Sequence, residues 1–428
     1  MAVISSAEDS FLADDFLRQL MSVGEVDLLV GIPSLNNATT ISQAVETIEQ
    51  SFQQNFPRDR VVILNVDGGS RDSTSEAFLS APLSKNSNPR SLTSLRTIHR
   101  VTTRYSNAPM QGGAFRTMLA AADLLRAKAC AVVSPVASNL TPACVGALLK
   151  PTARENFDYV APLYRRHRFD GLLARHLLYP MSRAIFGKRI RELHSDEFGF
   201  SCRLGSDWLN QNGWQDEAVQ FSPETWMALG AISSDFRCCQ TFLGQKTPPA
   251  TSSGTDIVAA VRRNVAALFW CIESQQLVWK ERSGSEPVPT IGSDHDLISE
   301  PVRVDRKRIL DMFRSGVSGL TTILETILEP GTHAEIQRIA ALDDRRVNFP
   351  ADVWVKTLYE FAAAYHHSVL NRDHLIQALV PLYRGRIYSF LLEHHDSTPE
   401  EIEADTETLC LEFEHQKPYL LEKWKARE

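Results

Sequence analysis

Two short apolar runs on either side of a helical segment constrain the fold of this chain more than any other feature. Residues 26–32 read VDLLVGI and residues 60–66 read RVVILNV, and neither run has the spacing of an amphipathic helix. Residues 38–52 between them do have that spacing. A strand, a helix and a second strand in succession predict a βαβ unit, whose strands are parallel and buried on both faces.

The same alternation continues along the chain and predicts an α/β protein with a mostly parallel, Rossmann-like sheet covered on both faces. An amphipathic helix is expected before the first strand, at residues 5–22. Further strands are expected near residues 95–101, 129–133 and 159–162, and helices near 113–128 and 142–150.

From about residue 256 the pattern becomes helical. A long helix is expected at 256–280, and residues 283–296 are rich in Ser, Gly and Pro, as is typical of a linker. Further helices are expected at 304–329, 352–367, 372–394 and 399–425. We therefore predict three segments: an N-terminal helix at 1–25, a sheet domain at 26–255 and a helical C-terminal region at 256–428.

Composition excludes several classes of protein. With 45 basic and 52 acidic residues the formal net charge is -7, so no overall positive field attracts nucleic acid. No apolar stretch approaches the roughly 18 residues of a membrane span, and the first residues lack the basic flank and apolar core of a signal peptide. We expect a cytoplasmic protein. Its seven cysteines show no C-x-x-C spacing, which predicts buried free thiols.

The loops that follow the predicted strands are the first place to look for a ligand site. In parallel sheets, ligands bind beyond the carboxyl ends of the strands, which here means residues 33–37, 67–72 and 134–139. The second loop begins Asp67-Gly68-Gly69-Ser70, where an aspartate can accept hydrogen bonds from a uracil or guanine and glycine permits close approach. The alternative is an ordinary turn capped by Asp72 and Ser73.

Several motifs resemble a known family. The pairing of Gly31-Ile32-Pro33-Ser34 with Asp67-Gly68-Gly69-Ser70 is similar to that in nucleotide-sugar glycosyltransferases of the A type (GT-A fold). More specifically, the chain resembles the glucosylglycerate and mannosylglycerate synthases over roughly residues 26–425. The matching segments are residues 160–171, 179–180, 186–191, 197–201, 242–244, 365–366, 370–374 and 381–386.

The resemblance implies roles for individual residues. Nucleotide-sugar binding is implied for Pro33, Ser34, Asp67, Gly68, Gln111, Gly112 and Arg116, acceptor binding for Arg166, His167 and Asp170, and a catalytic carboxylate for Glu224. The residues 165–168 read RRHR, a cationic patch suited to a carboxylate or phosphate; the alternative is a solvated basic loop with Asp170 as its partner. Glu224 stands where the family has an aspartate, and could deprotonate an acceptor hydroxyl. Its alternative is a glutamate in the first turn of a helix beside Pro223.

The chain departs from the family at four places. The D-x-D motif that holds Mg²⁺ or Mn²⁺ is replaced by Ser134-Pro135-Val136, and no histidine follows in Lys246-Thr247-Pro248-Pro249. The lysine of a nucleotide-binding loop has become Gln111, and a P-x-G-G segment reads Leu193-His194-Ser195-Asp196. Valine cannot coordinate a metal and serine is a weak neutral ligand, so we expect no metal cofactor.

Two functions compete at this point. In the first, the chain transfers glucose or mannose from a nucleotide-diphosphate sugar to a small acidic acceptor such as glycerate, with Arg116, Arg191 or Lys246 replacing the metal charge. In the second, it is a catalytically inactive binding or regulatory protein. A purely helical scaffold that keeps an ancestral sheet is a remote third. The resemblance also implies a possible homodimer.

Overall fold

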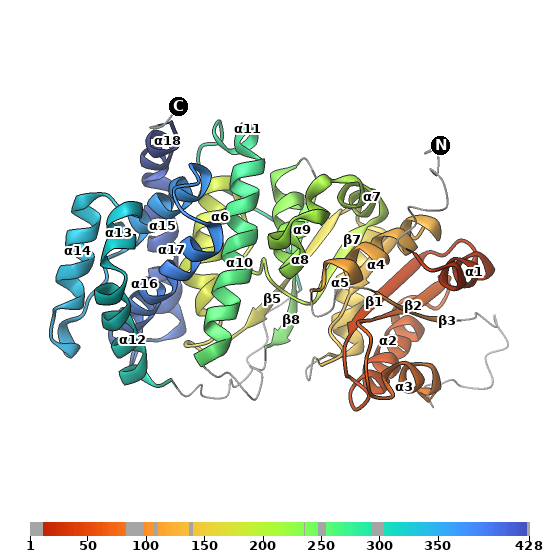
Figure 1. The fold of residues 1–428 in the computed structure, drawn as a ribbon. Coiled ribbons are helices and arrows are strands. Elements are labelled where there is room, and N and C mark those ends of the chain that lie inside the picture. Colours follow the sequence, from red (N-terminus) through yellow and green to blue (C-terminus); the bar gives the residue numbers. More distant parts are fainter. Residues whose placement is uncertain are drawn as a thin grey trace.

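The computed structural model describes residues 12–82, 98–105, 110–136, 140–234, 236–246, 254–292 and 304–425. Over these residues an eight-stranded sheet carries helices on both faces, and a body of helices packs against one end of it (Figure 1). The predicted class, an α/β protein with a mostly parallel sheet and a helical C-terminal region, is confirmed.

The strands of the large sheet lie in the order β3-β2-β1-β4-β7-β5-β8-β10. Neighbouring strands are parallel except at β7, which runs antiparallel to both β4 and β5. Their bounds are β1 Leu28–Ser34, β2 Val61–Asp67, β3 Ile98–Arg104, β4 Ala129–Val132, β5 Tyr159–Arg165, β7 Phe198–Ser201, β8 Cys238–Gln245 and β10 Thr290–Ile291. A separate pair joins β6 (Lys188–Arg189) to β9 (Glu286–Pro287).

Alternating side chains explain why the strands are buried on both faces. In β2, Val61 and Ile63 join one apolar core, while Val62 and Leu64 join the other, as expected for strands covered on both sides. One face is covered by α2 (Ile41–Asn55), α3 (Thr74–Ser80) and α5 (Pro142–Arg154). The other is covered by α1 (Asp14–Val23), α4 (Gly112–Leu124), α7 (Cys202–Asn210) and α9 (Pro223–Ser233).

The predicted elements of the first half exist, with shifted ends. The first two strands end at Ser34 and Asp67, beyond the expected residues 32 and 66. The helix expected over 113–128 ends at Leu124, because Arg126 adopts a positive φ of 51° that a helix does not allow. Of the expected leading helix, residues 5–11 lie outside the described residues.

The C-terminal region is helical, as predicted, with more breaks than expected. Three of the expected helices are each divided in two, and α14 was not predicted. The bounds are α10 Gly254–Ser274, α11 Gln276–Trp279, α12 Arg306–Gly319, α13 Thr321–Ile327, α14 Pro330–Ala340, α15 Ala351–His366, α16 Arg372–Glu393, α17 Pro399–His415 and α18 Lys417–Lys425. The segment expected to be a linker contributes β9 and β10, and β10 extends the large sheet beside β8.

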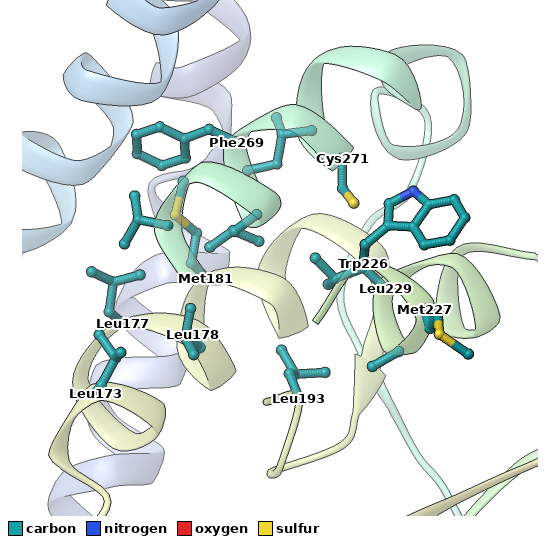
Figure 2. Packing of buried hydrophobic residues seen from close by; sticks show 14 of the residues in the cluster. Leu173, Leu177, Leu178, Met181, Leu193, Trp226, Met227, Leu229, Phe269 and Cys271 are labelled. Atoms are coloured by element: carbon teal, nitrogen blue, oxygen red, sulfur yellow. The ribbon is translucent and has the colours of Figure 1, made fainter. Parts of the chain in front are cut away.

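A continuous apolar core joins the sheet to the helices. Figure 2 shows Leu177 and Leu178 of the π-helix η1 (Ala174–Leu178) and Met181 of α6 (Tyr179–Phe186) near Phe269 of α10, with Trp226 of α9 in the same region. Polar contacts reinforce this junction. The fully buried Arg183 of α6 forms ion pairs with Glu407 (2.6 Å) and Glu414 (2.7 Å) of α17, so α17 is held firmly against α6.

Two further predictions can be compared with the described residues. Six of the seven cysteines are buried, the seventh is partly buried, and all are free thiols, which confirms that prediction. Within the described ranges, no helix has the length and apolar character needed to cross a bilayer.

Candidate functional site

The candidate site lies along the edge of the sheet where the parallel strands end. The antiparallel strand β7 starts at this edge, because its first residue, Phe198, pairs with Val132 at the end of β4. Glu197 therefore lies at the same edge as Ser34, Asp67 and Ser134. This edge is where α/β sheets bind ligands.

Asp67 is buried, and its carboxylate accepts three hydrogen bonds from the chain itself. Oδ1 accepts hydrogen bonds from the backbone N–H groups of Gly69 (2.7 Å) and Ser70 (2.6 Å), and Oδ2 accepts one from the Ser75 hydroxyl (3.0 Å). Asp67 is only 1% exposed. The carboxylate thus shapes the loop after β2, and a nucleotide base would have to share it with these donors.

Replacing Asp67 tests this structural role. We expect Asp67→Ala to lower the free energy of unfolding by about 3 kcal/mol, because buried N–H donors lose their acceptor. Asp67→Asn keeps one carbonyl oxygen for the backbone donors and should cost about 1 kcal/mol. Urea denaturation of both variants measures the difference. An alanine variant as stable as the wild type would show that these hydrogen bonds are not needed for the loop.

The loops after β1 and β2 hold each other in place. The N–H of Asn36 donates to the Ser70 hydroxyl (2.8 Å), and the Asn36 side-chain carbonyl accepts from the N–H of Arg71 (2.9 Å). The Asp72 carboxylate accepts from the N–H groups of Ala38 and Thr74, both at 3.1 Å. The capping role considered for Asp72 therefore occurs, whereas the Ser73 side chain makes no cap.

The first two residues of the predicted donor site belong to the same interlocked loops. Pro33 is partly buried, and the Ser34 hydroxyl donates to the side-chain carbonyl of Asn65 (2.7 Å). The N–H of Gly68 donates to the Ser34 carbonyl (2.8 Å). Pro33, Ser34, Asp67 and Gly68 are thus brought together, on neighbouring strand ends.

The start of α4 holds the other predicted donor-binding residues. A Cβ at Gly112 would lie 2.5 Å from the Gln220 side-chain oxygen and 3.0 Å from the Gln220 Cα. Only glycine therefore leaves room for α8 (Glu217–Phe221) to pack here. The Gln111 carbonyl accepts from Ala114 (2.9 Å) at the first turn. Arg116 is partly buried, and desolvation lowers its pKa. Roles for these three in nucleotide binding stay predictions.

The residues that replace the metal-binding motif do not fit a divalent cation. The Ser134 side chain is buried and accepts a long hydrogen bond from the N–H of Val136 (3.4 Å). Val136 is 60% exposed and offers no side-chain donor atom. Among the described residues, no three His, Cys, Asp or Glu side chains lie close enough to share a metal ion.

Three polar side chains surround the buried carboxylate of Glu197, which directly precedes β7. Its Oε2 accepts from Lys246 Nζ (2.7 Å), from the Ser195 hydroxyl (3.1 Å) and from the Tyr164 hydroxyl. Lys246 also lies 4.6 Å from the centre of the Tyr164 ring. The other carboxylate oxygen of Glu197, Oε1, is buried and lacks a hydrogen-bond partner within the described part of the chain. This leaves one strong acceptor for a ligand.

Glu224 follows at the start of α9. The Ser222 hydroxyl donates to its carboxylate (2.9 Å). Desolvation, reinforced by the Asp196 carboxylate, raises the pKa of Glu224 to about 7. Glu224 lies in the first turn of a helix, as one of the two readings expected. Its role as a general base stays a prediction, and a pKa near 7 is one that such a base needs at neutral pH.

The predicted acceptor residues are tied to one another and to Glu192. Arg166 forms two hydrogen bonds of 2.8 Å with the Glu192 carboxylate and one of 2.9 Å with Asp170. Burial opposes the charge, yet the Glu192 and Asp170 carboxylates raise the pKa of Arg166 overall. His167 is partly buried, and its Nδ1 accepts from the N–H of Phe169 (3.2 Å). The partnership with Asp170 that we considered for the basic loop is thus present.

These residues line a cavity with a volume of about 1170 Å³. It opens at the ends of β5 and β8, beside η1, and α17 forms the opposite wall. Five arginines and five carboxylates line it: Arg165, Arg166, Arg168, Arg175 and Arg191, with Asp170, Glu192, Glu400, Glu403 and Glu407. A polar chamber of this kind suits a small charged ligand.

Five of these ten residues were not identified from the sequence: Arg175, Glu192, Glu400, Glu403 and Glu407. Glu192 and Arg175 lie within or beside segments that carried the family resemblance, but nothing in their spacing singled them out. Glu403 lies on α17, in the run EEIEAD, which resembles an ordinary solvated helix face. Its partner Arg191 is 212 positions away, so only the folded chain brings them together.

No family model and no curated protein matches the chain. Among solved structures, the chain is similar to glucosyl-3-phosphoglycerate synthase from Mycobacterium tuberculosis in complex with Mn²⁺, uridine diphosphate and phosphoglyceric acid. The two chains are 17% identical, the match covers 60% of this chain and 82% of that chain, and the TM-score is 0.42. The complex of that enzyme with glucosyl-3-phosphoglycerate gives 17% identity, 62% and 86% coverage, and a TM-score of 0.42. The similarity expected from the motifs is therefore present in the chain trace. At TM-scores below 0.5, nothing follows from it about what this chain binds.

Proposed function

We propose that this chain is a hexosyltransferase that moves glucose or mannose from a nucleotide-diphosphate sugar to a small acidic acceptor such as glycerate. The observation that carries the proposal is the arginine-lined cavity at the ends of β5 and β8. Tyr164, which lines this cavity, donates to Glu197, whose Oε1 is buried and has no hydrogen-bond partner among the described residues. The donor would bind in the interlocked loops after β1 and β2, on the same edge of the sheet.

The reaction requires a base for the acceptor hydroxyl, and we assign that role to Glu224. Its carboxylate takes the hydroxyl proton, the acceptor oxygen bonds to the anomeric carbon, and the bond from that carbon to the diphosphate oxygen breaks. A base with a pKa near the working pH transfers protons most efficiently, and the pKa of Glu224 is raised to about 7.

The proposed reaction proceeds without a divalent cation, because Ser134 and Val136 cannot supply its ligands. Positive side chains then have to stabilise the departing diphosphate. Lys246 lies at the end of β8 and already donates to Glu197, so its charge is fixed in position at the sheet edge. Arg191 is paired with Glu403 and would act only after release from it.

A calorimetric titration with UDP-glucose and GDP-mannose, in EDTA and in Mn²⁺, tests this proposal. We expect one donor to bind with the same affinity in both media, and to release its nucleoside diphosphate when glycerate is added. The release would be followed by a coupled assay. Donor binding that requires Mn²⁺ would contradict metal-independent transfer, and lack of turnover with every donor would contradict the transferase.

A catalytically inactive binding protein is the second candidate, and one observation favours it. Asp67 and Arg166, which the resemblance assigns to the donor and the acceptor, each already make three hydrogen bonds to groups of this chain. The same titration separates the two candidates. Donor binding without nucleotide release in the presence of acceptor would support the inactive protein.

A further inference from the structure

Most of the arginines around the cavity are already engaged. Arg166 is held by Glu192 and Asp170, and Arg168 donates to the Ser397 carbonyl (3.3 Å). Arg191 pairs with Glu403 of α17, and its guanidinium lies 5.3 Å from the centre of the Tyr179 ring. The predicted acceptor ligand Arg166 is therefore a fixed part of the wall.

Arg175 is held more loosely than Arg166 and Arg191. Among the described residues it forms no ion pair with a carboxylate. One of its N–H groups donates to the Arg168 carbonyl (3.0 Å), and its guanidinium lies 5.9 Å from the centre of the Phe390 ring. A guanidinium has five N–H donors, so donors remain for a ligand. Desolvation lowers the pKa of Arg175, and the charges of Arg191 and Arg166 lower it further, whereas the Glu403 and Asp170 carboxylates raise it. The pKa is lowered overall, so these two carboxylates do not fully compensate the loss of hydration around the guanidinium.

The backbone around Arg175 is also unusual. The residue lies in η1, a five-residue π-helix that starts directly after Leu173. Such turns are rare and often occur at functional sites. Both Arg175 and Arg191 line the cavity, and Glu403 faces them from α17. The Glu403 carboxylate pairs with Arg191, and its charge also acts on Arg175. Two arginines that share one carboxylate form a site that an oxyanion fits.

We propose that Arg175 and Arg191 bind the anionic group of the acceptor, and that the Glu403 carboxylate occupies this subsite when no acceptor is present. The identity of the ligand as an acceptor rests on the proposed function, whereas the anion site does not. Glu403 is then a competitor built into the chain. It is 47% exposed in its pair with Arg191, so its release leaves no buried unpaired charge.

Calorimetry on the full chain, with inorganic phosphate and with glycerate as separate probes, tests the subsite. We expect Arg175→Gln to weaken binding by about 10-fold or more, the usual effect of losing charged hydrogen bonds. Arg175→Lys keeps the charge but loses the planar fork, and should fall between. Glu403→Gln should tighten binding by about 3-fold to 10-fold, because the competitor is neutralised. The tighter of the two probes distinguishes a phosphate from a carboxylate ligand.

Two control variants separate pairing from a general change in charge. Glu412→Gln removes the same charge from the same helix, at a position that does not line the cavity, and should change affinity by less than about 2-fold. Arg262→Gln breaks a surface pair with Asp373 on other helices, and should leave affinity unchanged. Circular dichroism of each variant shows whether it folds.

The inference fails if Arg175→Gln, folded, binds both probes as the wild type does, or if Glu403→Gln binds more weakly. It also fails if neither the wild type nor Glu403→Gln binds either probe. Its failure is distinguishable from that of the proposed function. Anion binding with these responses but no hexose transfer would sink the function alone, whereas transfer with an unchanged KM for glycerate in Arg175→Gln would sink this inference alone.

Discussion

Gly199→Ala should prevent α5 from packing against β7 and leave little folded protein. Gly199 lies in β7, between β4 and β5, and α5 crosses directly over it. A Cβ there would lie 2.1 Å from the Leu148 carbonyl oxygen and 3.3 Å from the Val160 Cβ. Backbone cannot move aside as a flexible side chain can, so the expected loss of stability is more than about 4 kcal/mol. Expression yield and urea denaturation measure it.

Gly319→Ala is the matched control. Gly319 is the last residue of α12, and a Cβ there would meet no atom within 4 Å. This substitution should be neutral or stabilise by up to about 1 kcal/mol, because alanine has less freedom to lose on folding. If Gly199→Ala unfolds at the same urea concentration as the wild type, the close packing of α5 on β7 is wrong.

Glu224→Gln should reduce hexose transfer by about 100-fold to 10,000-fold, the usual contribution of a general base. In the wild type, the rate should rise as the pH rises through about 7, because the carboxyl group is protonated below that value and cannot accept a proton. The glutamine variant should lose this dependence. Initial rates of nucleoside diphosphate release, measured from about pH 5.5 to 9, would show both the loss of rate and the loss of pH dependence. This range extends about 1.5 to 2 units to either side of the pKa.

Stability provides the control for this loss. Because the folded pKa is raised, Glu224 favours the folded state at low pH, and this contribution is lost as the pH rises through about 7. Glu224→Gln should therefore be at least as stable as the wild type at pH 8. Glu217→Gln, which neutralises an exposed carboxylate of α8, should keep full activity. An active Glu224→Gln enzyme with an unchanged pH profile would remove Glu224 from the mechanism.

The sequence predicts the sheet best where burial on both faces leaves a strong pattern. The runs of β1 and β2 are continuous and β-branched, so their existence was clear, although β1 continues through Pro33 to Ser34. It can do so because β4 pairs with β1 only as far as Gly31. β7 was missed because four residues with a central glycine carry no such pattern. Its antiparallel insertion between β4 and β5 is a property of the whole fold.

The residues of the candidate site were predicted only in part, because their pairing also depends on the whole fold. Motifs pointed to Asp67 and Arg166, which lie where β2 and β5 end, but residue types do not show whether a side chain is already engaged. Arg166 is engaged by Glu192, 26 positions away, and Arg191 by Glu403, 212 positions away. The pair of Arg191 with Glu403 forms only because α17 packs against α6, and no local pattern encodes that packing. Arg175 could have been noticed only from the π-helix, which sequence spacing does not reveal.

The strand β10 has a practical consequence for anyone who wishes to divide this protein. Although it follows α10 in the chain, it supplies the outermost partner of β8. A gene fragment that stopped at residue 255 would leave β8 with a bare row of N–H and C=O groups, the kind of edge that recruits strands from other molecules. Such a truncated product would tend to precipitate, so fragments for crystallisation or partner screening need to run through residue 292 at least.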